Sequence, residues 1–596
     1  MKISRLVAGA AVIAAGALVL SGCAAPQSEI VQGTSLSIAQ NSPFTSYNSS
    51  VAVDNSTYNS NISYLTNSTF NYYDSTPTLK KNTKFGTYTV VSKSPLTVKY
   101  TIADGVKWSD GTPVDAADML LQWVSSQSKY NQGKVNFGSA VAGTGLDLIK
   151  DIPKISDGGK SLTLVYSKPF TDWEVAFYSG NTATVPAHVT YDLAFPGKKL
   201  SPADAKKAFE KAVDTNDTAS LAKIAKAFAT GYKMQSMPSN KNLVLSDGAY
   251  VITSLVKNQY VTLTANKDYT WGPLPHVSKI TVRFISDPLA QVQALQNGEV
   301  SIISGQATSD TIKALAQLKG ITTKTSNEST YEHVDLTFNN KGPFDPATYG
   351  GDASKALAVR KAFLQALPRQ DILDKLIKPL NKDATLDDSQ TFLPGAPGYA
   401  ESIANNGSKA YDTVDTAGAL KALQAAGITT PVTVKFAYPN DNPRRVSEFQ
   451  LIQASENKAG FNVVDAGSPG ATFFGNLGNG SYDVSIFAWQ FTSLAVTGTE
   501  AQLKTAPKGS TTSANYNGYS NATVDSNFTD LDTTTVASKQ QSLLQSIDKQ
   551  TWKDAYGATL YQLPDVSANS NKVSNVIDAP LAPTVFWNFW QWQVKK

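Results

Sequence analysis

Cysteine and histidine are scarce in this sequence, which has one cysteine and three histidines in 596 residues. Because a lone cysteine cannot close an intramolecular disulfide, no disulfide framework is expected, and hydrophobic cores must hold the fold together. His188, His276 and His333 lie far apart along the chain, whereas metal sites use ligands at close spacing or on facing elements. We therefore predict no metal ion and no other cofactor, and interpret each histidine as structural.

An excess of positive charge is also missing. The chain has 52 lysines and arginines against 48 acidic residues, a net charge of +4. Residues 1–22 contain Lys2 and Arg5 and no acidic residue, so the remainder carries 4 − 2 = +2. A near-neutral chain lacks the basic surface that nucleic-acid binding requires, and no G-x-x-x-x-G-K-[ST] motif is present to hold ATP phosphates. We expect neither nucleic-acid binding nor ATP hydrolysis by this chain.

Long hydrophobic runs are absent beyond residue 22, where none reaches the ~18 residues of a membrane span. Lys2 and Arg5 precede the apolar run Leu6–Leu20, a pattern typical of a signal peptide in residues 1–22. Cys23 follows small residues, as in the lipobox of bacterial lipoproteins, which predicts acylation of Cys23 and a lipid-anchored tether over residues 23–33. An ordinary signal peptide with a chance cysteine is the alternative. The acylated chain would lie on the extracytoplasmic face of the cell membrane.

The stretch Asp104–Trp123 combines several carboxylates with two Asp-Gly pairs and an apolar run. Acid–base catalysis is one interpretation of carboxylates at this density. The Asp-Gly pairs at 104–105 and 110–111 favour turns instead. Asp115, with Asp118 three residues later, is spaced as an N-terminal helix cap. We therefore predict two turns followed by a capped helix, and no catalytic residue.

The same stretch contains the run DGVKWSDGTPVDAADML, which resembles the signature of the extracytoplasmic solute-binding proteins that serve peptide and nickel ABC transporters. Ala103 stands where this family usually has arginine, and Asp115 where it usually has threonine. Further short matches follow in the family's order, including ANKDYTWGPLPHVSKITVRFI at 265–285, VRKAFLQALPRQDIL at 359–373 and SYDVSIFAW at 481–489. They extend the resemblance from about residue 34 to about residue 575.

A chain of 596 residues exceeds the size that one hydrophobic core usually reaches, so two or more lobes are expected. The resemblance implies an α/β fold of the periplasmic-binding-protein type, with two lobes, two hinge crossovers and an extra subdomain on lobe one. The predicted divisions are lobe one at 34–284 with its subdomain at about 62–195, lobe two at 285–557, and a return to lobe one at 558–596. The crossovers are expected near Phe284–Pro288 and Ala558–Pro564.

The resemblance also implies a ligand site between the lobes. There the family has a tryptophan, followed three residues later by an aspartate that grips the ammonium of a bound peptide. Here the segment is Ala488-Trp489-Gln490-Phe491-Thr492, with threonine in place of the aspartate. Because a charge-assisted hydrogen bond contributes roughly 1.5–3 kcal/mol, we expect recognition of a free amine to be weaker at Thr492.

Two aromatic residues, Phe44 and Tyr47, follow the first predicted strand and are further candidates for the site, with packing onto the core as their alternative. The predicted ligand-binding residues are therefore Phe44, Tyr47, Ala488, Trp489, Phe491 and Thr492. Phe586–Trp592, near the C-terminus, is expected to form a closing strand packed on lobe one, with a stacking platform for sugar rings as the alternative.

Three functions are considered. The resemblance implies a monomeric, lipid-anchored receptor that delivers peptides to an ABC permease with its own ATPase subunits. An oligosaccharide or another amine-free solute is the alternative ligand, favoured by Thr492 and by nine tryptophans, 25 tyrosines and 24 phenylalanines. A surface-anchored hydrolase is the third: Ser468 lies in a near match to G-x-S-x-G, but Pro469 removes the backbone N–H that an oxyanion hole would use.

Overall fold

The computed structural model describes residues 30–139, 145–178, 185–305, 307–491, 496–507 and 514–595. The predicted signal peptide, Cys23 and the tether up to residue 29 lie outside the described residues, as does Thr492. Strand β1 spans Val31–Gln40, so the last three residues of the predicted tether belong to a strand. Within the described ranges, no helix has both the length and the apolar character needed to cross a membrane.

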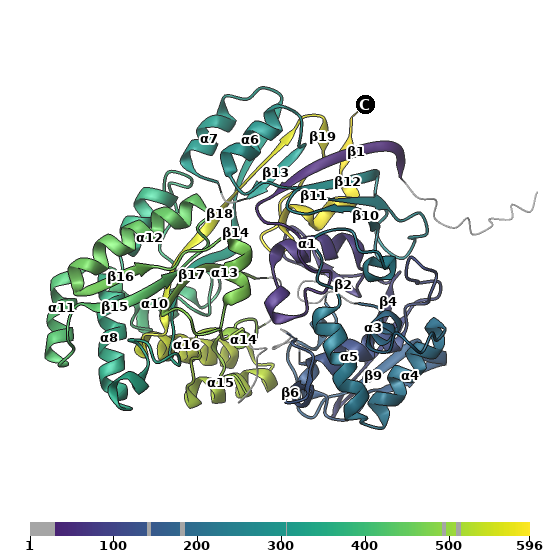
Figure 1. The fold of residues 1–596 in the computed structure, drawn as a ribbon, viewed down its shortest axis with the longest axis horizontal. Coiled ribbons are helices and arrows are strands. Elements are labelled where there is room, and N and C mark those ends of the chain that lie inside the picture. The colour runs from purple at the N-terminus through teal and green to yellow at the C-terminus, as the bar shows by residue number, and fades with distance from the viewer. Residues whose placement is uncertain are drawn as a thin grey trace, which may run out of the picture.

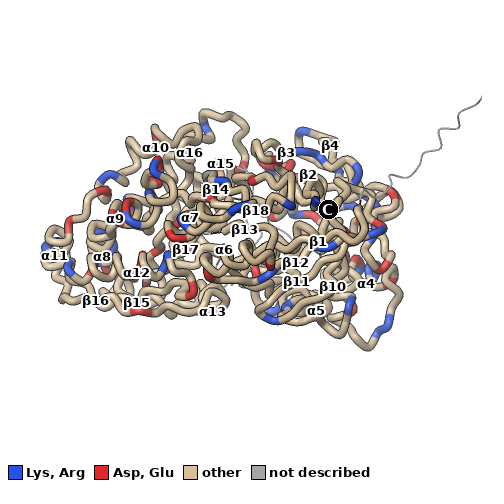
Figure 2. The backbone as a smooth tube through the Cα atoms, turned by 90° about the horizontal axis from the view of Figure 1, so that it is seen from above, with Lys and Arg blue, Asp and Glu red and all other residues tan. Residues whose placement is uncertain are grey.

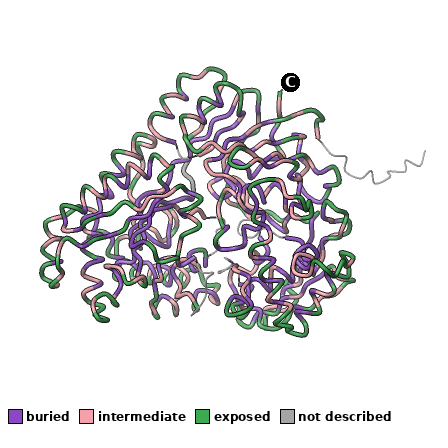
Figure 3. Tube along the Cα trace, in the orientation of Figure 1, coloured by how far each residue is buried: buried purple, intermediate pink, exposed green. Residues whose placement is uncertain are grey.

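The fold is α/β with two lobes side by side, as predicted (Figure 1). One mixed sheet of ten strands runs through both lobes in the order β10-β11-β12-β1-β13-β18-β14-β17-β15-β16. Besides β1, its strands are β10 (Tyr250–Val256), β11 (Tyr260–Ala265), β12 (Val277–Phe284), β13 (Ile302–Gly305), β14 (Ile321–Leu336), β15 (Val432–Ala437), β16 (Phe461–Asp465), β17 (Val484–Gln490) and β18 (Gly557–Ser570). Figure 3 shows that buried residues are concentrated along these strands.

The two longest strands, β14 and β18, carry the chain between the lobes. They pair antiparallel along their length, with a register shift between Asn327 and Tyr331. The carboxyl half of β18 also pairs with β13, and the later half of β14 pairs with β17. The return crossing thus runs through β18. We place the first crossing in β14, later in the chain than Phe284–Pro288, because α6 (Pro288–Gln296) and α7 (Ser309–Ala316) share a hydrophobic cluster with β1.

Lobe one joins its part of the sheet to a subdomain through one continuous hydrophobic cluster. The subdomain contains a four-stranded sheet in the order β4-β5-β9-β8. Its strands and helices are β4 (Gly86–Lys93), β5 (Leu96–Ile102), β8 (Lys154–Ser156), β9 (Ser161–Val165), α2 (Ala116–Ser126), α3 (Ala187–Ala194), α4 (Pro202–Asp214) and α5 (Thr218–Thr230). Small two-stranded sheets and α1 complete the lobe: β2 (Asn71–Tyr73), β3 (Leu79–Lys81), β6 (Asn131–Gln132), β7 (Val135–Asn136) and α1 (Thr57–Thr66).

The stretch Asp104–Trp123 has the predicted form of two turns and a capped helix. Gly105 and Gly111 adopt φ values of 82° and 90°, which a residue with a side chain rarely takes. Asp115 caps α2 in a reciprocal capping box with Asp118. The carboxylate of Asp118 also lies 2.7 Å from Lys206 Nζ. These carboxylates are therefore occupied in holding the subdomain together.

Lobe two carries its helices around β15, β16 and β17 (Figure 1). They are α8 (Ala353–Ala366), α9 (Arg369–Ile372), α10 (Tyr399–Asn405), α11 (Thr416–Ala425), α12 (Pro443–Glu456), α13 (Gly470–Asn476), α14 (Glu500–Leu503), α15 (Ala522–Thr533) and α16 (Ala537–Lys553). The C-terminal aromatic segment returns to lobe one, where Phe589 packs against Tyr64 and Tyr250. It forms a 3-10 helix, Thr584–Gln591, instead of the predicted strand, and β19 (Val573–Ser574) pairs with β20 (Gln593–Val594) around it.

Charged residues of both signs are interspersed over both lobes (Figure 2). This distribution agrees with the small net charge of the sequence. Many of the charges belong to exposed ion pairs within one helix or one hairpin, such as Lys375 with Asp371 at 2.8 Å. Pairs of this kind contribute little to stability, typically 0.2–1 kcal/mol.

Candidate functional site

The carboxyl ends of the parallel strands of the two lobes face one another. In lobe one β1 runs parallel to β12 and β13, and in lobe two β15 runs parallel to β16 and β17. Helix α13, after β16, lies against the turn Ala52–Asp54, after β1. A Cβ atom placed on Gly470 would lie 3.8 Å from Ser42 Oγ. Ligands of open α/β sheets bind at such carboxyl edges, so this edge is the expected position of the ligand site.

Trp489 stands in an aromatic cluster at this edge of lobe two. Its ring is nearly parallel to the rings of His333 and Tyr516, at centroid distances of 6.2 and 5.9 Å and interplanar angles of 2° and 10°. Phe487 meets Trp489 edge-on at 5.3 Å. Trp489 itself is only half-buried. An indole packed against neighbouring rings and open on part of its surface is suited to pack against an apolar or planar group of a solute.

The strand register explains how these rings come together. Tyr331 and His333 of β14 stand directly opposite Trp489 and Phe487 of β17. Alternate residues of a strand point to the same face, so the four rings share one side of the sheet. The imidazole Nδ1 of buried His333 lies 2.9 Å from Asp335 Oδ1, which fixes the ring beside Trp489. Ala488, one residue along, points to the other face and packs on the core of lobe two.

Phe491 is fixed by its backbone at the junction of the two lobes. Its carbonyl accepts hydrogen bonds from Ser329 Oγ at 3.1 Å and from the N–H of Ala582 at 3.2 Å. Its ring lies 5.9 Å from that of Tyr331. Trp489 and Phe491 thus lie in one aromatic group, while Thr492, the residue predicted to weaken amine binding, lies outside the described residues.

Phe44 and Tyr47 lie in the core of lobe one. The exposed fractions of their side chains are 1% and 0%. The hydroxyl of Tyr47 donates to the carbonyl of Leu245 at 2.7 Å. Core packing, the alternative for both residues, accounts for these contacts, and their contact with a ligand stays a prediction.

Behind the aromatic cluster, on the opposite face of the sheet, lies a buried group of charges that the sequence did not suggest. Arg444 donates to Glu332 at 2.6 Å and to Glu448 at 2.9 Å. Arg445 Nε donates to Glu332 at 2.8 Å, and the Tyr561 hydroxyl contacts both Arg444 and Glu448. Glu332 and Tyr561 are paired residues of the crossing strands β14 and β18. The group therefore ties α12 to the hinge.

The pKa values of the two glutamates move in opposite directions. Burial raises the pKa of Glu332, but the guanidinium groups of Arg444 and Arg445 outweigh it and lower the pKa to about 2. Burial raises the pKa of Glu448 to about 7; Arg444 opposes this shift and the charge of Glu332 adds to it. Glu332 is therefore the firmly ionised partner of the two arginines.

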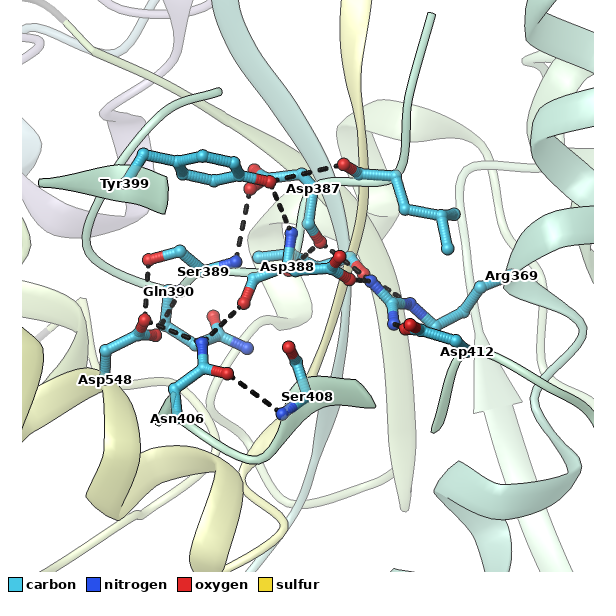
Figure 4. A network of polar contacts seen from close by, with 12 residues as sticks. Arg369, Asp387, Asp388, Ser389, Gln390, Tyr399, Asn406, Ser408, Asp412 and Asp548 are labelled. Atoms are coloured by element: carbon cyan, nitrogen blue, oxygen red, sulfur yellow. Dashed lines mark hydrogen bonds and ion pairs between the residues drawn. The ribbon is translucent and has the colours of Figure 1, made fainter. Parts of the chain in front are cut away.

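A second buried network holds the segment around Asp387–Ser408 onto lobe two (Figure 4). Asp548 accepts hydrogen bonds from Ser389, Gln390, Ser402 and Asn406 at 2.5–2.9 Å. Arg369 donates to Asp388 at 2.6 Å and to the carbonyl of Thr559 in β18 at 3.0 Å. These contacts join loops, helices and strand β18 of the same lobe to one another, so we interpret this network as structural.

The described residues contain no group of three or more histidine, cysteine or acidic side chains arranged to hold a metal ion. His188 Nε2 lies 3.1 Å from Asp110 in the subdomain, and His333 is paired with Asp335. Ser468 follows β16, where its N–H donates to the carbonyl of Tyr438 at 3.0 Å.

A surface groove of about 620 Å³ opens elsewhere on lobe two. It is lined by Lys341, Lys355, Lys435 and Asp483, among others. It includes the amino end of β15, at Val432 and Thr433, whereas Trp489 lies at the carboxyl end of β17. The groove is therefore distinct from the aromatic cluster between the lobes.

Known proteins match most of the length of this chain. The family model described as bacterial extracellular solute-binding proteins, family 5 (middle), matches residues 83–503. An uncharacterized lipoprotein of Mycobacterium tuberculosis is 22% identical over 99% of this chain and 98% of its own. The oligopeptide-binding protein OppA of the same organism is 22% identical over 81% of this chain and 72% of its own.

Solved structures share the fold. The periplasmic EDTA-binding protein EppA superposes with a TM-score of 0.72 at 22% identity, covering 95% of this chain and 97% of its own. The oligopeptide-binding protein AppA of Bacillus subtilis, solved with a nonapeptide, has a TM-score of 0.72 at 16% identity and covers 96% of this chain and 100% of its own. At these identities the likeness establishes the two-lobed architecture.

Proposed function

Because the chain belongs to the bacterial extracellular solute-binding proteins of family 5, we propose that it captures peptides between its two lobes and delivers them to a membrane permease. The chain is the substrate-binding component of an ABC importer. The observation that carries the peptide proposal is the cluster of Trp489, His333 and Tyr516 where the carboxyl edges of the two lobes meet. Peptide binding by relatives named OppA and AppA supports it.

The amine-free solute remains the second candidate, since threonine replaces the expected aspartate at position 492. A peptide whose amino terminus is not gripped there could still be held by its backbone and by packing on Trp489. An oligosaccharide would use the same rings for stacking. The two candidates differ in their need for a free ammonium group.

Thermal unfolding with added solutes tests the peptide proposal. We expect short peptides to raise the free energy of unfolding by about 2.7 kcal/mol at ~100 times Kd, because a ligand of the folded state alone stabilises it by mass action. N-acetylated copies of the same peptides are the matched control. Equal shifts with free and acetylated peptides would support a weakened amine site at Thr492. Stabilisation by oligosaccharides and by no peptide would contradict the peptide proposal.

Membrane attachment is proposed to occur through an acylated Cys23. Relatives named as lipoproteins support this anchor. In Cys23→Ala, we expect the protein to move from the membrane fraction to the soluble extracytoplasmic fraction, because one residue would carry all the acyl chains. Fractionation followed by mass spectrometry of the amino-terminal peptide measures the change. Retention of the variant in the membrane fraction after removal of residues 1–22 would show that another element attaches the chain.

The family binds solutes, and we propose that this member performs no reaction on them. The hydrolase hypothesis depends on the carboxylates of Asp104–Trp123 and on Ser468, but Asp115 and Asp118 cap α2 and Pro469 lacks the backbone N–H that an oxyanion hole would use. From the same family assignment, we also propose that the protein acts as a monomer together with a membrane permease and its ATPase subunits.

A further inference from the structure

One carboxylate of the subdomain reaches across to lobe two. Asp172 accepts hydrogen bonds from the backbone N–H groups of Val496 and Thr497, at 3.2 and 3.1 Å. It also accepts one from the hydroxyl of Thr497 at 2.9 Å. These partners lie 324 and 325 residues away in the sequence. The contact joins the two lobes directly, with no hinge strand between them.

The neighbouring residue strengthens the same contact. The N–H of Thr171 donates to the carbonyl of Asp532 at 3.0 Å, and the Thr171 hydroxyl accepts from Gln540 Nε2 at 2.8 Å. Asp532 and Gln540 belong to α15 and α16 of lobe two. Two consecutive residues of the subdomain therefore bond to α15, to α16 and to the loop at Val496 and Thr497 in the opposite lobe.

The local backbone places Asp172 where an aspartate usually caps a helical turn, but its side chain makes no capping hydrogen bond. It occupies the capping position of the 3-10 turn Trp173–Val175, where an aspartate ordinarily accepts from the first backbone N–H groups of the turn. Its carboxylate makes no such bond. The side chain is directed at Val496 and Thr497 instead, so its carboxylate oxygens accept hydrogen bonds across the contact between the lobes.

The contact also lies far from the hinge. In Figure 1, α14 and α15 stand beside the subdomain at the lower end of lobe two, and β14 and β18 cross between the lobes higher up. When the lobes rotate apart about β14 and β18, the residues farthest from these strands move the most. Opening of the lobes therefore separates Asp172 from Thr497. Thr497 also accepts from the N–H of Glu500 at the start of α14, which links the contact to an ordered turn.

We propose that Asp172 is a positioning residue that fastens the closed form of the protein without touching the solute. Solute release would require its three hydrogen bonds to break, so Asp172 would set how long a captured solute is retained. This inference rests on the proposed solute-binding function. It adds a determinant of affinity on the subdomain, remote from Trp489.

Two variants and one control test the proposal. Asp172→Ala removes the acceptor, and Asp172→Asn keeps its size while losing the charge and one acceptor oxygen. Asp151→Asn, an exposed aspartate of the same subdomain, is the matched control. For a random-sequence nonapeptide pool, measured by tryptophan fluorescence, we expect the apparent Kd to rise about tenfold in Asp172→Ala, less in Asp172→Asn, and not in the control.

A distance measurement separates this inference from the proposed function. Spin labels at Lys154→Cys in the subdomain and Lys539→Cys in α16, both exposed, with Cys23→Ser, report the separation of the lobes with and without the pool. We expect a short-distance population in the parent protein that falls in Asp172→Ala. Equal populations in parent and variant, or none in the parent, would overturn the role of Asp172. A pool that binds to no protein, with the population still dependent on Asp172, would overturn the peptide proposal alone.

Discussion

Replacing Glu332 with glutamine is expected to lower the free energy of unfolding by about 3–5 kcal/mol, because breaking a buried ion pair leaves its partner charged and unpaired. Glu332 accepts from both Arg444 and Arg445, and all three side chains are at least 94% buried. Arginine cannot lose its proton to relieve the imbalance. Denaturant unfolding at neutral pH measures the loss.

Glu448→Gln is the matched control, since Glu448 contacts the same Arg444 and is equally buried. Its pKa of about 7 means that it is partly neutral at neutral pH, so an amide alters it less. The pH dependence has opposite signs at the two sites. Glu332 stabilises the fold above its unfolded pKa of about 4.3, and this is lost as pH falls toward 2. Because the pKa of Glu448 is raised in the folded protein, its contribution to the free energy of unfolding falls as pH rises from about 4.3 to 7. Equal losses in both variants would contradict this assignment.

The architecture was predictable where short-range chemistry determines it. Asp115 and Asp118 formed the predicted capping box because caps depend on residues three apart. A cap of the same local kind separates α4 from α5, where Asp217 caps the second helix by accepting from the N–H groups of Ala219 and Ser220. The strand predicted at Phe586–Trp592 was wrong because its aromatic residues are buried on lobe one in a 3-10 helix, for which composition gives no signal.

The site was predictable only in part. Trp489 was identified from a motif, but its stacking partners His333 and Tyr516 come from distant segments that only the strand register brings together. Glu332 has no sequence signal, although Arg444 and Glu448 have the four-residue spacing of a helical ion pair. Asp172 has no sequence signal for its contact with Val496 and Thr497. Contacts across more than 300 residues depend on the relative position of the lobes, which local patterns do not encode.

Replacing Trp489 with alanine is expected to weaken solute binding by about 100-fold, equivalent to ~2.8 kcal/mol. Tryptophans packed at the centre of a binding surface commonly contribute this much when removed. Trp489 packs against His333 and Tyr516, so its position is fixed before solute arrives. A preorganised ring avoids the entropy cost of ordering it on binding. Titration calorimetry with the most stabilising peptide measures the loss.

The control must separate loss of a contact from loss of structure, because Trp489 also packs within lobe two. Trp590→Ala removes an indole of similar partial burial that packs on Tyr72 and Phe589 in lobe one. We expect it to lower the melting temperature and leave affinity unchanged. Trp489→Phe, which keeps a ring beside His333 and Tyr516, should recover part of the binding. Equal affinity in Trp489→Ala and the parent protein would place the solute away from this cluster, since no other change in the variant could compensate for a missing ring.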